Sequence, residues 1–429
     1  MMMDYATRKK LVELRYSIND RLRINEFIFS RIFILWAIIG LLGGIMAGFY
    51  WIILDELTHV LAHFTGAWVI ACMTGGGLIA GLIIYLLRDP GEIDLIVNNI
   101  RFRGGRLDTR NNPAMILSSL ICIASGGSLG PETPMIQVVG STGTWLAKRL
   151  HFRNEDIRSM TIAGVASGFT ALFGAPLGSS LFALEILHHK HVTEYYQALI
   201  PAIVASCTSY IVFVIITHIG IGPSWQFPAS YEVHVNDAFY AIGFGIMAAA
   251  VGWAFIFLVR TGKRFFKKLP FPIFVKTTIG GLLLGIMAYE LPITRYFSHY
   301  QIPELFNQHF TLQLLLAILI VKLLAITVTV TSGWRGGFII PLFFTGATLG
   351  LIISYFFPYS QPALIMVCCM AALNACVTRT PVSSTILVAT MTGVHLLIPI
   401  LFASLTGFFL APKTPLINAQ LRKHEKHEE

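Results

Sequence analysis

Charged residues are scarce in this sequence. Of its 429 residues, Asp, Glu, Lys and Arg make up only 12%, whereas 55% are hydrophobic, and the mean hydropathy is +0.70. A water-soluble domain of this length needs a larger charged surface, so the composition excludes that class of protein. Apolar runs long enough to cross a bilayer recur, for example at 33–54 and 68–87. The chain is therefore predicted to be an all-α, polytopic integral membrane protein.

Cysteine and metal-ligating patterns are sparse as well. The six cysteines lie singly or as one adjacent pair within apolar segments, without the paired spacing of a metal site. We expect them to be small buried hydrophobic residues. Basic patches interleaved with aromatic residues, which nucleic-acid-binding proteins use, are missing. The sequence thus predicts no metal site, no cofactor beyond a bound anion, and no nucleic-acid partner.

Basic residues concentrate in short segments outside the apolar runs. They occur in the first 25 residues, at 260–268 between two spans, and at the start of the tail. No small-residue cleavage site follows the first segment, which indicates a basic helix rather than a signal peptide. Positively charged loops stay in the cytoplasm, so we expect both termini there. The protein is predicted to be multi-pass in the plasma membrane, the inner membrane of a bacterium.

Spans and helix breakers divide the chain into two comparable membrane halves. Long helices are predicted near 27–60, 66–87, 193–217, 234–261, 271–290 and 311–331, with shorter pieces interrupted by Gly and Pro between them. The predicted segments are a cytoplasmic basic helix at 1–26, a first membrane half at 27–218, a linker at 219–233, a second half at 234–412, and a C-terminal cytoplasmic helix and tail at 413–429.

The two halves share interrupted segments at matching places. The segment at 173–186 resembles the one at 378–391, since each has a Pro followed by small hydroxyl residues. The segment at 125–143 resembles the one at 332–350 more loosely, and the separation is about 205 residues in both cases. A single duplication explains both pairs, although Gly-rich apolar segments also resemble one another by chance. Interrupted helices at corresponding positions of two halves are typical of a transporter's binding site.

The glycine-rich breaks suggest an anion as ligand. A helix that starts inside the bilayer leaves its first backbone N–H groups without partners, and its amino end carries a partial positive charge. Gly126, Gly127 and Gly130 precede a helix predicted to start at Pro131, and Gly337 precedes a second one predicted to start near Pro341. Two such half-helices would hold a dehydrated anion with their amino ends. The alternative is that these glycines only allow close helix packing.

These motifs resemble those of the CLC family of chloride channels and proton-coupled chloride transporters. The stretch 127–131 resembles the glycine-proline anion motif of that family, and 332–341 resembles its second-half motif. The similarity runs from about residue 30 to 421, to divergent prokaryotic-type members without C-terminal regulatory domains. It implies two inverted-topology halves, broken helices meeting at a midplane anion site, and a homodimer with one pathway per subunit. The implied anion-binding residues are Gly127, Ser128, Leu129, Gly130, Pro131, Gly337, Phe338, Ile339, Ile340 and Ile417.

The sequence also departs from the family pattern. Leu129 stands where the family usually has a gating glutamate, and a carboxylate follows instead at Glu132. Ile186, directly after Glu185, stands where proton-coupled members have a second glutamate. Ile417 falls where a tyrosine is expected near the chain end, and 87–93 replaces the first serine-containing anion motif. The family's inner chloride site of hydroxyl groups is therefore not reproduced.

Glu132 is predicted to be a displaced gate. A carboxylate at a helix amino terminus resembles the anion for which the site is built, so it would compete with that anion when ionised. Alternatively, Glu132 caps the helix and never enters the pathway. Glu185 lies inside a predicted membrane helix and could accept protons from the cytoplasmic side. Its alternative role is a buried glutamate hydrogen-bonded to a neighbouring helix.

The predicted function is transmembrane transport of a chloride-type anion, by uncoupled, channel-like conduction with Glu132 as gate. One alternative is a proton-coupled antiporter that uses Glu132 and Glu185, and another is a transporter for fluoride or bicarbonate. The partners are a small inorganic anion and the lipid bilayer. We do not expect an enzyme, although residues 126–130 satisfy the G-x-S-x-G pattern of a serine hydrolase. In an intramembrane protease Ser128 would need His218 or His395 as base.

Two further groups of basic residues lie beside the predicted membrane segments. The run His188, His189, Lys190 and His191 is predicted to attract anions to a cytoplasmic funnel, with metal binding as the alternative. Arginines beside the predicted breaks either line vestibules or anchor the chain at the interface; they are Arg88, Arg335 and Arg379.

Overall fold

The computed structural model describes residues 31–152, 154–187, 192–227, 234–307, 310–357, 361–393 and 396–420. Within these ranges the chain is helical, and the only pairing of extended backbone is one isolated bridge between Gly130 and Gly337. The predicted basic helix at 1–26, the histidine run at 188–191 and His395 lie outside the described residues.

Six helices are long and apolar enough to cross a membrane. They are α2 (Arg31–Ala62), α3 (Trp68–Leu87), α9 (Val192–Thr217), α10 (Val235–Lys268), α11 (Ile273–Glu290) and α13 (Leu312–Ser332). All six predicted long helices are confirmed, although α10 continues seven residues beyond its predicted end at 261. The additional residues of α10 belong to the basic segment 260–268. Their charged side chains can reach water at the point where the helix leaves the apolar layer.

Shorter elements fill the space between these helices. They are α4 (Ile93–Phe102), η1 (Thr109–Asn111), α5 (Asn112–Ala124), α6 (Glu132–Arg149), α7 (Asn154–Phe173), α8 (Pro176–Glu185), η2 (Pro292–Thr294), α12 (Gln301–Asn307), α14 (Ile339–Ser354), α15 (Pro362–Thr378), α16 (Pro381–Thr392), α17 (Leu397–Phe409) and η3 (Asn418–Gln420). With a rise of about 1.5 Å per residue, helices such as α8 and α16 reach only about 15 to 18 Å and cannot cross a hydrocarbon layer of about 30 Å. Their ends therefore lie inside the protein.

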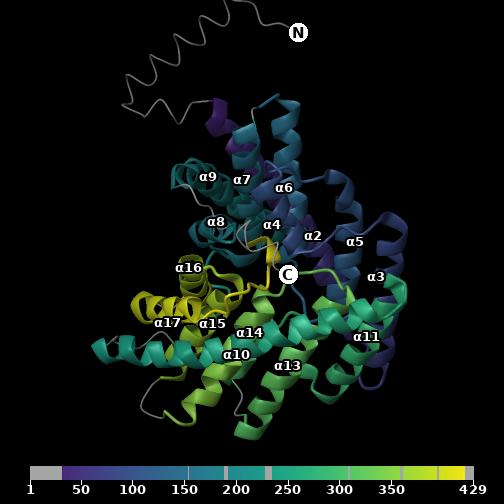
Figure 1. Ribbon diagram of the computed structural model, residues 1–429, viewed down its shortest axis with the longest axis vertical. Coiled ribbons are helices and arrows are strands. Elements are labelled where there is room, and N and C mark those ends of the chain that lie inside the picture. The colour runs from purple at the N-terminus through teal and green to yellow at the C-terminus, as the bar shows by residue number, and fades with distance from the viewer. Residues whose placement is uncertain are drawn as a thin grey trace, which may run out of the picture.

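The short helices form the interior. Nearly every side chain of α14 and α15 is buried, whereas α3, α9 and α11 expose large apolar side chains on one face. In Figure 1 the first half of the chain, coloured purple to teal, occupies most of the upper part of the molecule, and α10, α11, α13 and α14 lie below it. The innermost layer thus consists of the half-helices that follow the sequence breaks.

Glycines allow α3 and α11 to pack closely at the junction of the halves. A Cβ atom on Gly285 of α11 would lie 2.7 Å from the Cα atom of Ile70, and one on Gly81 of α3 would lie 2.5 Å from the Cα atom of Phe274. Small residues are what allow two membrane helices to approach in this way. The two helices lie side by side in Figure 1.

The described part of the predicted C-terminal helix and tail, residues 413–420, contains no α-helix, and 421–429 lie outside the described residues. Residues 413–417 are irregular, and only the three-residue turn η3 follows before the described residues end. Pro412 and Pro415 supply no N–H groups, and the carbonyl groups of 412–415 accept hydrogen bonds from Arg379 and Arg260 instead. The segment returns to the centre of the molecule (Figure 1), where Arg101 donates to the carbonyl of Ala419.

Candidate functional site

The two glycine-rich breaks meet in space. Gly130 and Gly337 exchange two backbone hydrogen bonds, both with an N···O distance of 2.7 Å. Gly130 lies in the loop between α5 and α6, and Gly337 lies in the loop between α13 and α14. The pairing brings the amino ends of α6 and α14 to one place, which we call the Gly130–Gly337 bridge. The expectation that the breaks of the two halves face each other is confirmed.

Glu132 is the first residue of α6 and lies directly at this bridge. Its side chain is fully buried, and its Oε1 atom accepts a hydrogen bond of 2.9 Å from the backbone N–H of Ile340 in α14. Its Oε2 atom has no hydrogen-bond partner among the described residues. A Cβ atom on Gly130 would lie 2.7 Å from Cδ of Glu132, and one on Gly337 would lie 2.8 Å from it. The carboxylate therefore contacts both breaks and occupies the space between them.

No cation forms an ion pair with Glu132 in the part of the chain that the structure describes. The groups near its carboxylate are instead backbone N–H groups at the amino ends of two helices, which carry partial positive charge. A buried carboxylate without a cation is costly, and such residues in membrane segments are usually functional. The arrangement can hold a small anion, and here the protein's own carboxylate takes that place.

The other residues of the first break have separate surroundings. Leu129 is fully buried in an apolar cluster that includes Cys122 and Trp334. Gly127 donates its N–H to the carbonyl of Cys122, and the buried hydroxyl of Ser128 has no partner in the described structure. Leucine at position 129 therefore belongs to the packing around the bridge, and within the described ranges the only carboxylate at the bridge is Glu132, three residues further along.

Both half-helices begin at slightly different residues from those predicted. Helix α6 starts at Glu132, with Pro131 immediately before it, and α14 starts at Ile339 rather than near Pro341. Pro341 is the third residue of α14, where its missing N–H would have had no intrahelical partner, so the proline does not define the start. Phe338, Ile339 and Ile340 are buried at this amino end.

Ile417 is buried in the C-terminal segment. Its carbonyl accepts a hydrogen bond from the backbone N–H of Gln420. The side-chain amide of Gln420 donates to the carbonyls of Ile186 and Thr378. The hydrogen bonds of the described residues connect this segment with α8 and α15, and none of them joins Ile417 to the bridge.

Glu185 caps a helix of the opposite half. It ends α8, and its carboxylate accepts hydrogen bonds from the N–H groups of Val382 and Ser383, at 3.2 and 2.8 Å, and from the Ser383 hydroxyl at 2.6 Å. These donors are at the amino end of α16. Glu132 and Glu185 thus bind the amino ends of two different second-half helices, and no hydrogen bond links them.

Two buried cations beside the first break were not identified from the sequence. Lys322 of α13 is fully buried, and its Nζ atom donates to the carbonyls of Thr294 and Tyr296 at 3.0 and 2.8 Å. Arg295 donates to the carbonyl of Ser125 at 3.3 Å, to that of Leu61 in α2 and to that of Phe64 just after α2. Neither forms an ion pair within the described ranges. Lys322 is the only charge in the apolar run 312–331, and this was the signal that could have revealed it.

Arg335 lies on the second break and is neutralised by acids. Its guanidinium lies 2.7 Å from Asp89 and 3.6 Å from Glu92, and Lys263 of α10 lies 2.8 Å from Glu92. The loop 88–92, which replaces the family's first anion motif, is therefore held against the second break. Arg335 is buried in this ion-pair network, Arg379 binds carbonyls of the C-terminal segment, and Arg88 is exposed.

Among the described residues, no histidine forms a hydrogen bond with the serine of the G-x-S-x-G pattern. The hydroxyl of Ser128 is buried without a hydrogen-bond partner, and His218 is exposed after the end of α9. His395, the other candidate base, lies outside the described residues.

The family model described as "Voltage gated chloride channel" matches residues 76–412. The chain belongs to this chloride channel family. Among curated relatives, a "Chloride/fluoride channel protein" of Pseudomonas syringae pv. tomato is 25% identical, covering 91% of this chain and 86% of that protein. A "Putative chloride channel protein ClcB-like" of Ralstonia nicotianae is 27% identical, covering 80% of this chain and 82% of that protein.

Solved structures share the fold of this chloride channel family member. A slow cyanobacterial Cl⁻/H⁺ antiporter matches with a TM-score of 0.80 at 18% identity, over 90% of this chain and 96% of that chain. A CLC-type fluoride/proton antiporter matches with a TM-score of 0.81 at 22% identity, over 92% of this chain and 99% of that chain. The predicted fold class, an all-α CLC-like membrane protein, is confirmed.

Proposed function

We propose that this protein conducts a chloride-type anion across the membrane without coupled proton movement, along a pathway that crosses the Gly130–Gly337 bridge. The observation that carries the proposal is the position of the Glu132 carboxylate, which lies between the amino ends of α6 and α14 and contacts both breaks. A negatively charged oxygen already fits there. In the conducting state the carboxylate leaves this place and the permeant anion enters it.

Backbone N–H groups at the bridge suit an anion that must also leave. They attract it through partial charges and do not form a salt bridge that would hold it. Arg295 adds a positive charge near the first break. Its two terminal guanidinium nitrogens donate to carbonyls, whereas its buried Nε has no partner among the described residues. It would raise the anion's local concentration by a long-range attraction that is strong in a medium of low dielectric.

Proton-coupled antiport is the second candidate. Two structural relatives are antiporters for protons and chloride or fluoride, and Glu132 is a buried carboxylate at the bridge. Against it, Glu185 is engaged by three donors at the start of α16, and Ile186 follows it where proton-coupled members carry a glutamate. This hydrogen bonding supports a capping role for Glu185. Fluoride remains a candidate anion because one relative is named a chloride/fluoride channel protein.

Topology and assembly are part of the same proposal. The basic end of α10 and the C-terminal segment lie together, since Arg260 donates to the carbonyl of Thr414 at 2.7 Å. Arg158 and Arg101 connect the first half to this same face through the carbonyls of Arg101 and Ala419. This shared basic face supports a cytoplasmic location for the C-terminus in a bacterial inner membrane. We further propose a homodimer with one pathway in each subunit.

The decisive experiment measures anion efflux and proton uptake together. Liposomes containing the purified protein and loaded with chloride, or with fluoride, are diluted into anion-poor buffer while an anion electrode and a pH electrode record the same vessel. Efflux without proton movement supports uncoupled conduction, and Glu132→Gln should then change the rate or its pH dependence. Stoichiometric proton uptake would refute the uncoupled mechanism in favour of antiport. Absence of efflux of either anion would contradict the proposed pathway.

A further inference from the structure

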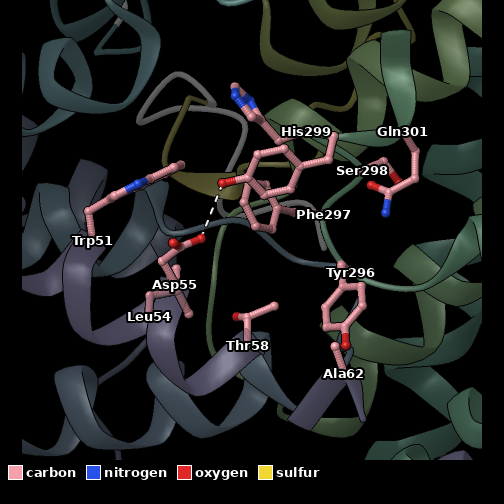
Figure 2. Close-up of a pocket in the computed structure, with 11 residues that line it drawn as sticks. Trp51, Leu54, Asp55, Thr58, Ala62, Tyr296, Phe297, Ser298, His299 and Gln301 are labelled. Atoms are coloured by element: carbon pink, nitrogen blue, oxygen red, sulfur yellow. Dashed lines mark hydrogen bonds between the residues drawn. The ribbon is translucent and has the colours of Figure 1, made fainter. Parts of the chain in front are cut away.

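A cavity of about 210 Å³ lies away from the bridge, between the last turns of α2 and the segment 296–301 that follows α11 and η2. Its walls are mainly apolar and aromatic, and Trp51, Leu54 and Asp55 line it from α2 (Figure 2). Helix α2 is long enough to cross the membrane, and the cavity lies toward its end at Ala62. Lipid headgroups and the adjacent water occupy that level of a spanning helix.

The cavity carries a single negative charge at neutral pH. Asp55 is the only lining residue with a formal charge there, and the Tyr300 hydroxyl donates to its Oδ1 atom at 3.2 Å (Figure 2). Burial, with a smaller contribution from Asp55, raises the pKa of Tyr300 to about 12, so this hydroxyl stays protonated. Burial lowers the pKa of His299 to about 4, so its ring is neutral. The occupant that this charge favours is a monovalent cation.

The walls match an organic cation rather than a metal ion. Trp51, Tyr296, Phe297 and Tyr300 all line the cavity, and aromatic faces attract ammonium groups. A divalent metal ion requires several oxygen or nitrogen ligands, and no cluster of three His, Cys, Asp or Glu residues that could hold one exists within the described ranges. The combination of one carboxylate and several aromatic rings is the chemistry that recognises an ammonium group.

Hydrogen-bond acceptors without partners also line the cavity. Tyr296 Oη, Ser298 Oγ, His299 Nδ1 and Gln301 Oε1 are buried atoms that make no hydrogen bond in the described structure. Buried polar atoms are nearly always satisfied, so four in one short segment require an explanation. A primary ammonium group has three N–H donors and can supply what these acceptors lack.

The segment that carries these acceptors is held in an unusual backbone conformation. Tyr296 and Ser298 have φ angles of +60° and +67°, which residues other than glycine rarely adopt. Lys322 donates to the Tyr296 carbonyl, and the Tyr296 N–H donates to the Gly126 carbonyl at 3.0 Å. These contacts fix the cavity wall before any ligand arrives, and a fixed wall reduces the ordering cost of binding.

We propose that this cavity binds a primary organic ammonium group, either the ethanolamine headgroup of a membrane lipid or a free amine. Asp55 supplies the opposite charge, and the aromatic side chain of Trp51 forms part of the wall around the cation. Tyr296 also lines the cavity, but the Arg295 guanidinium lies 4.6 Å from the centroid of its ring. The acceptors on 298–301 take its N–H groups.

The test uses the full-length protein in nanodiscs of phosphatidylglycerol, with methylammonium titrated calorimetrically at constant ionic strength. Asp55→Asn should weaken binding at least about tenfold, because it removes the charge while an oxygen still accepts from Tyr300. Glu56→Gln is the matched control, since Glu56 is the next residue of α2 and lies outside the cavity; it should change binding less than twofold. Tetramethylammonium, which lacks N–H donors, should bind more weakly than methylammonium.

Two further arms keep the result interpretable. If Asp55→Asn fails to fold, Trp51→Leu should weaken methylammonium binding several-fold through loss of an aromatic wall. Nanodiscs that contain phosphatidylethanolamine identify the source of the ligand: a weaker apparent affinity for methylammonium means that the lipid headgroup competes, whereas an unchanged affinity means a free amine. No binding in phosphatidylglycerol nanodiscs, or equal weakening by Asp55→Asn and Glu56→Gln, would overturn the proposal.

Discussion

Substituting Gly130 by Ala should move the Glu132 carboxylate away from the bridge. The added methyl group would lie 2.7 Å from Cδ and 2.8 Å from Oε1 of Glu132, and closer still to Oε2. Ordinary contacts of this kind are about 3.5 Å or longer. Gly130 does not have a positive φ, so its backbone accepts Ala without strain. The obstructing atoms are at the flexible end of a side chain, so that end moves while the backbone pairing with Gly337 remains.

The size of the effect follows from the hydrogen bond that is lost. Glu132 accepts from the N–H of Ile340 at 2.9 Å, and a hydrogen bond to a charged group contributes about 1.5 to 3 kcal/mol. Since about 1.4 kcal/mol is a factor of ten, the displaced carboxylate becomes about 10 to 150 times more populated. If the ionised carboxylate blocks the pathway, anion efflux at neutral pH should rise by about tenfold or more.

The assay is chloride efflux from proteoliposomes at neutral pH, with the rate normalised to the amount of folded protein. Gly243→Ala is the matched control, because Gly243 lies in α10 and a Cβ atom there contacts nothing within 4 Å. In the background of Glu132→Gln, Gly130→Ala should add little, since the charge it displaces is already absent. An unchanged rate in folded Gly130→Ala, or a full increase in the Glu132→Gln background, would show that Glu132 is only a helix cap.

Three other predictions follow from buried groups. Lys322→Met should lower the melting temperature, because it leaves two carbonyl acceptors unsatisfied at about 1 to 3 kcal/mol each; an unchanged melting temperature in the folded variant would exclude this stabilising role. Glu185→Ala should destabilise the protein by a similar amount without altering the ratio of protons to anions moved, and a changed ratio would make Glu185 a proton carrier. Burial lowers the pKa of the His299 ring to about 4 in the folded protein. In the unfolded chain this ring has a pKa of about 6.5, so the unfolded state takes up the proton first as the pH falls. Stability should then fall by up to about 2 kcal/mol between pH 7 and pH 5, and thermal melts of His299→Phe should lose this part of the pH dependence.

Long helices could be predicted because their cause is local. Continuous apolar runs, together with Gly and Pro at their ends, located α3, α11 and α13 within two residues of their bounds. The meeting of Gly130 and Gly337 was also predictable, because the duplication places equivalent breaks in both halves and an anion site needs both.

Other parts of the site depend on contacts between distant residues. The capping of α16 by Glu185 joins residues about 200 positions apart, and no local pattern reveals it. Arg295 reaches Ser125 only because the segment after α11 folds over the end of α2. Residues 413–417, part of the predicted C-terminal helix and tail, are irregular because arginines from α10 and from the loop before α16 bind their carbonyls, which sequence patterns alone do not show.

The Gly130–Gly337 bridge has a consequence for how such a protein could arise. Each half contributes one glycine of the bridge and one helix amino end, so neither half contains a complete site. An ancestral chain with a single repeat could form the bridge only by pairing with a second copy inserted in the opposite orientation. Expressing the two halves as separate polypeptides should therefore restore transport only when both are present and inserted in opposite senses.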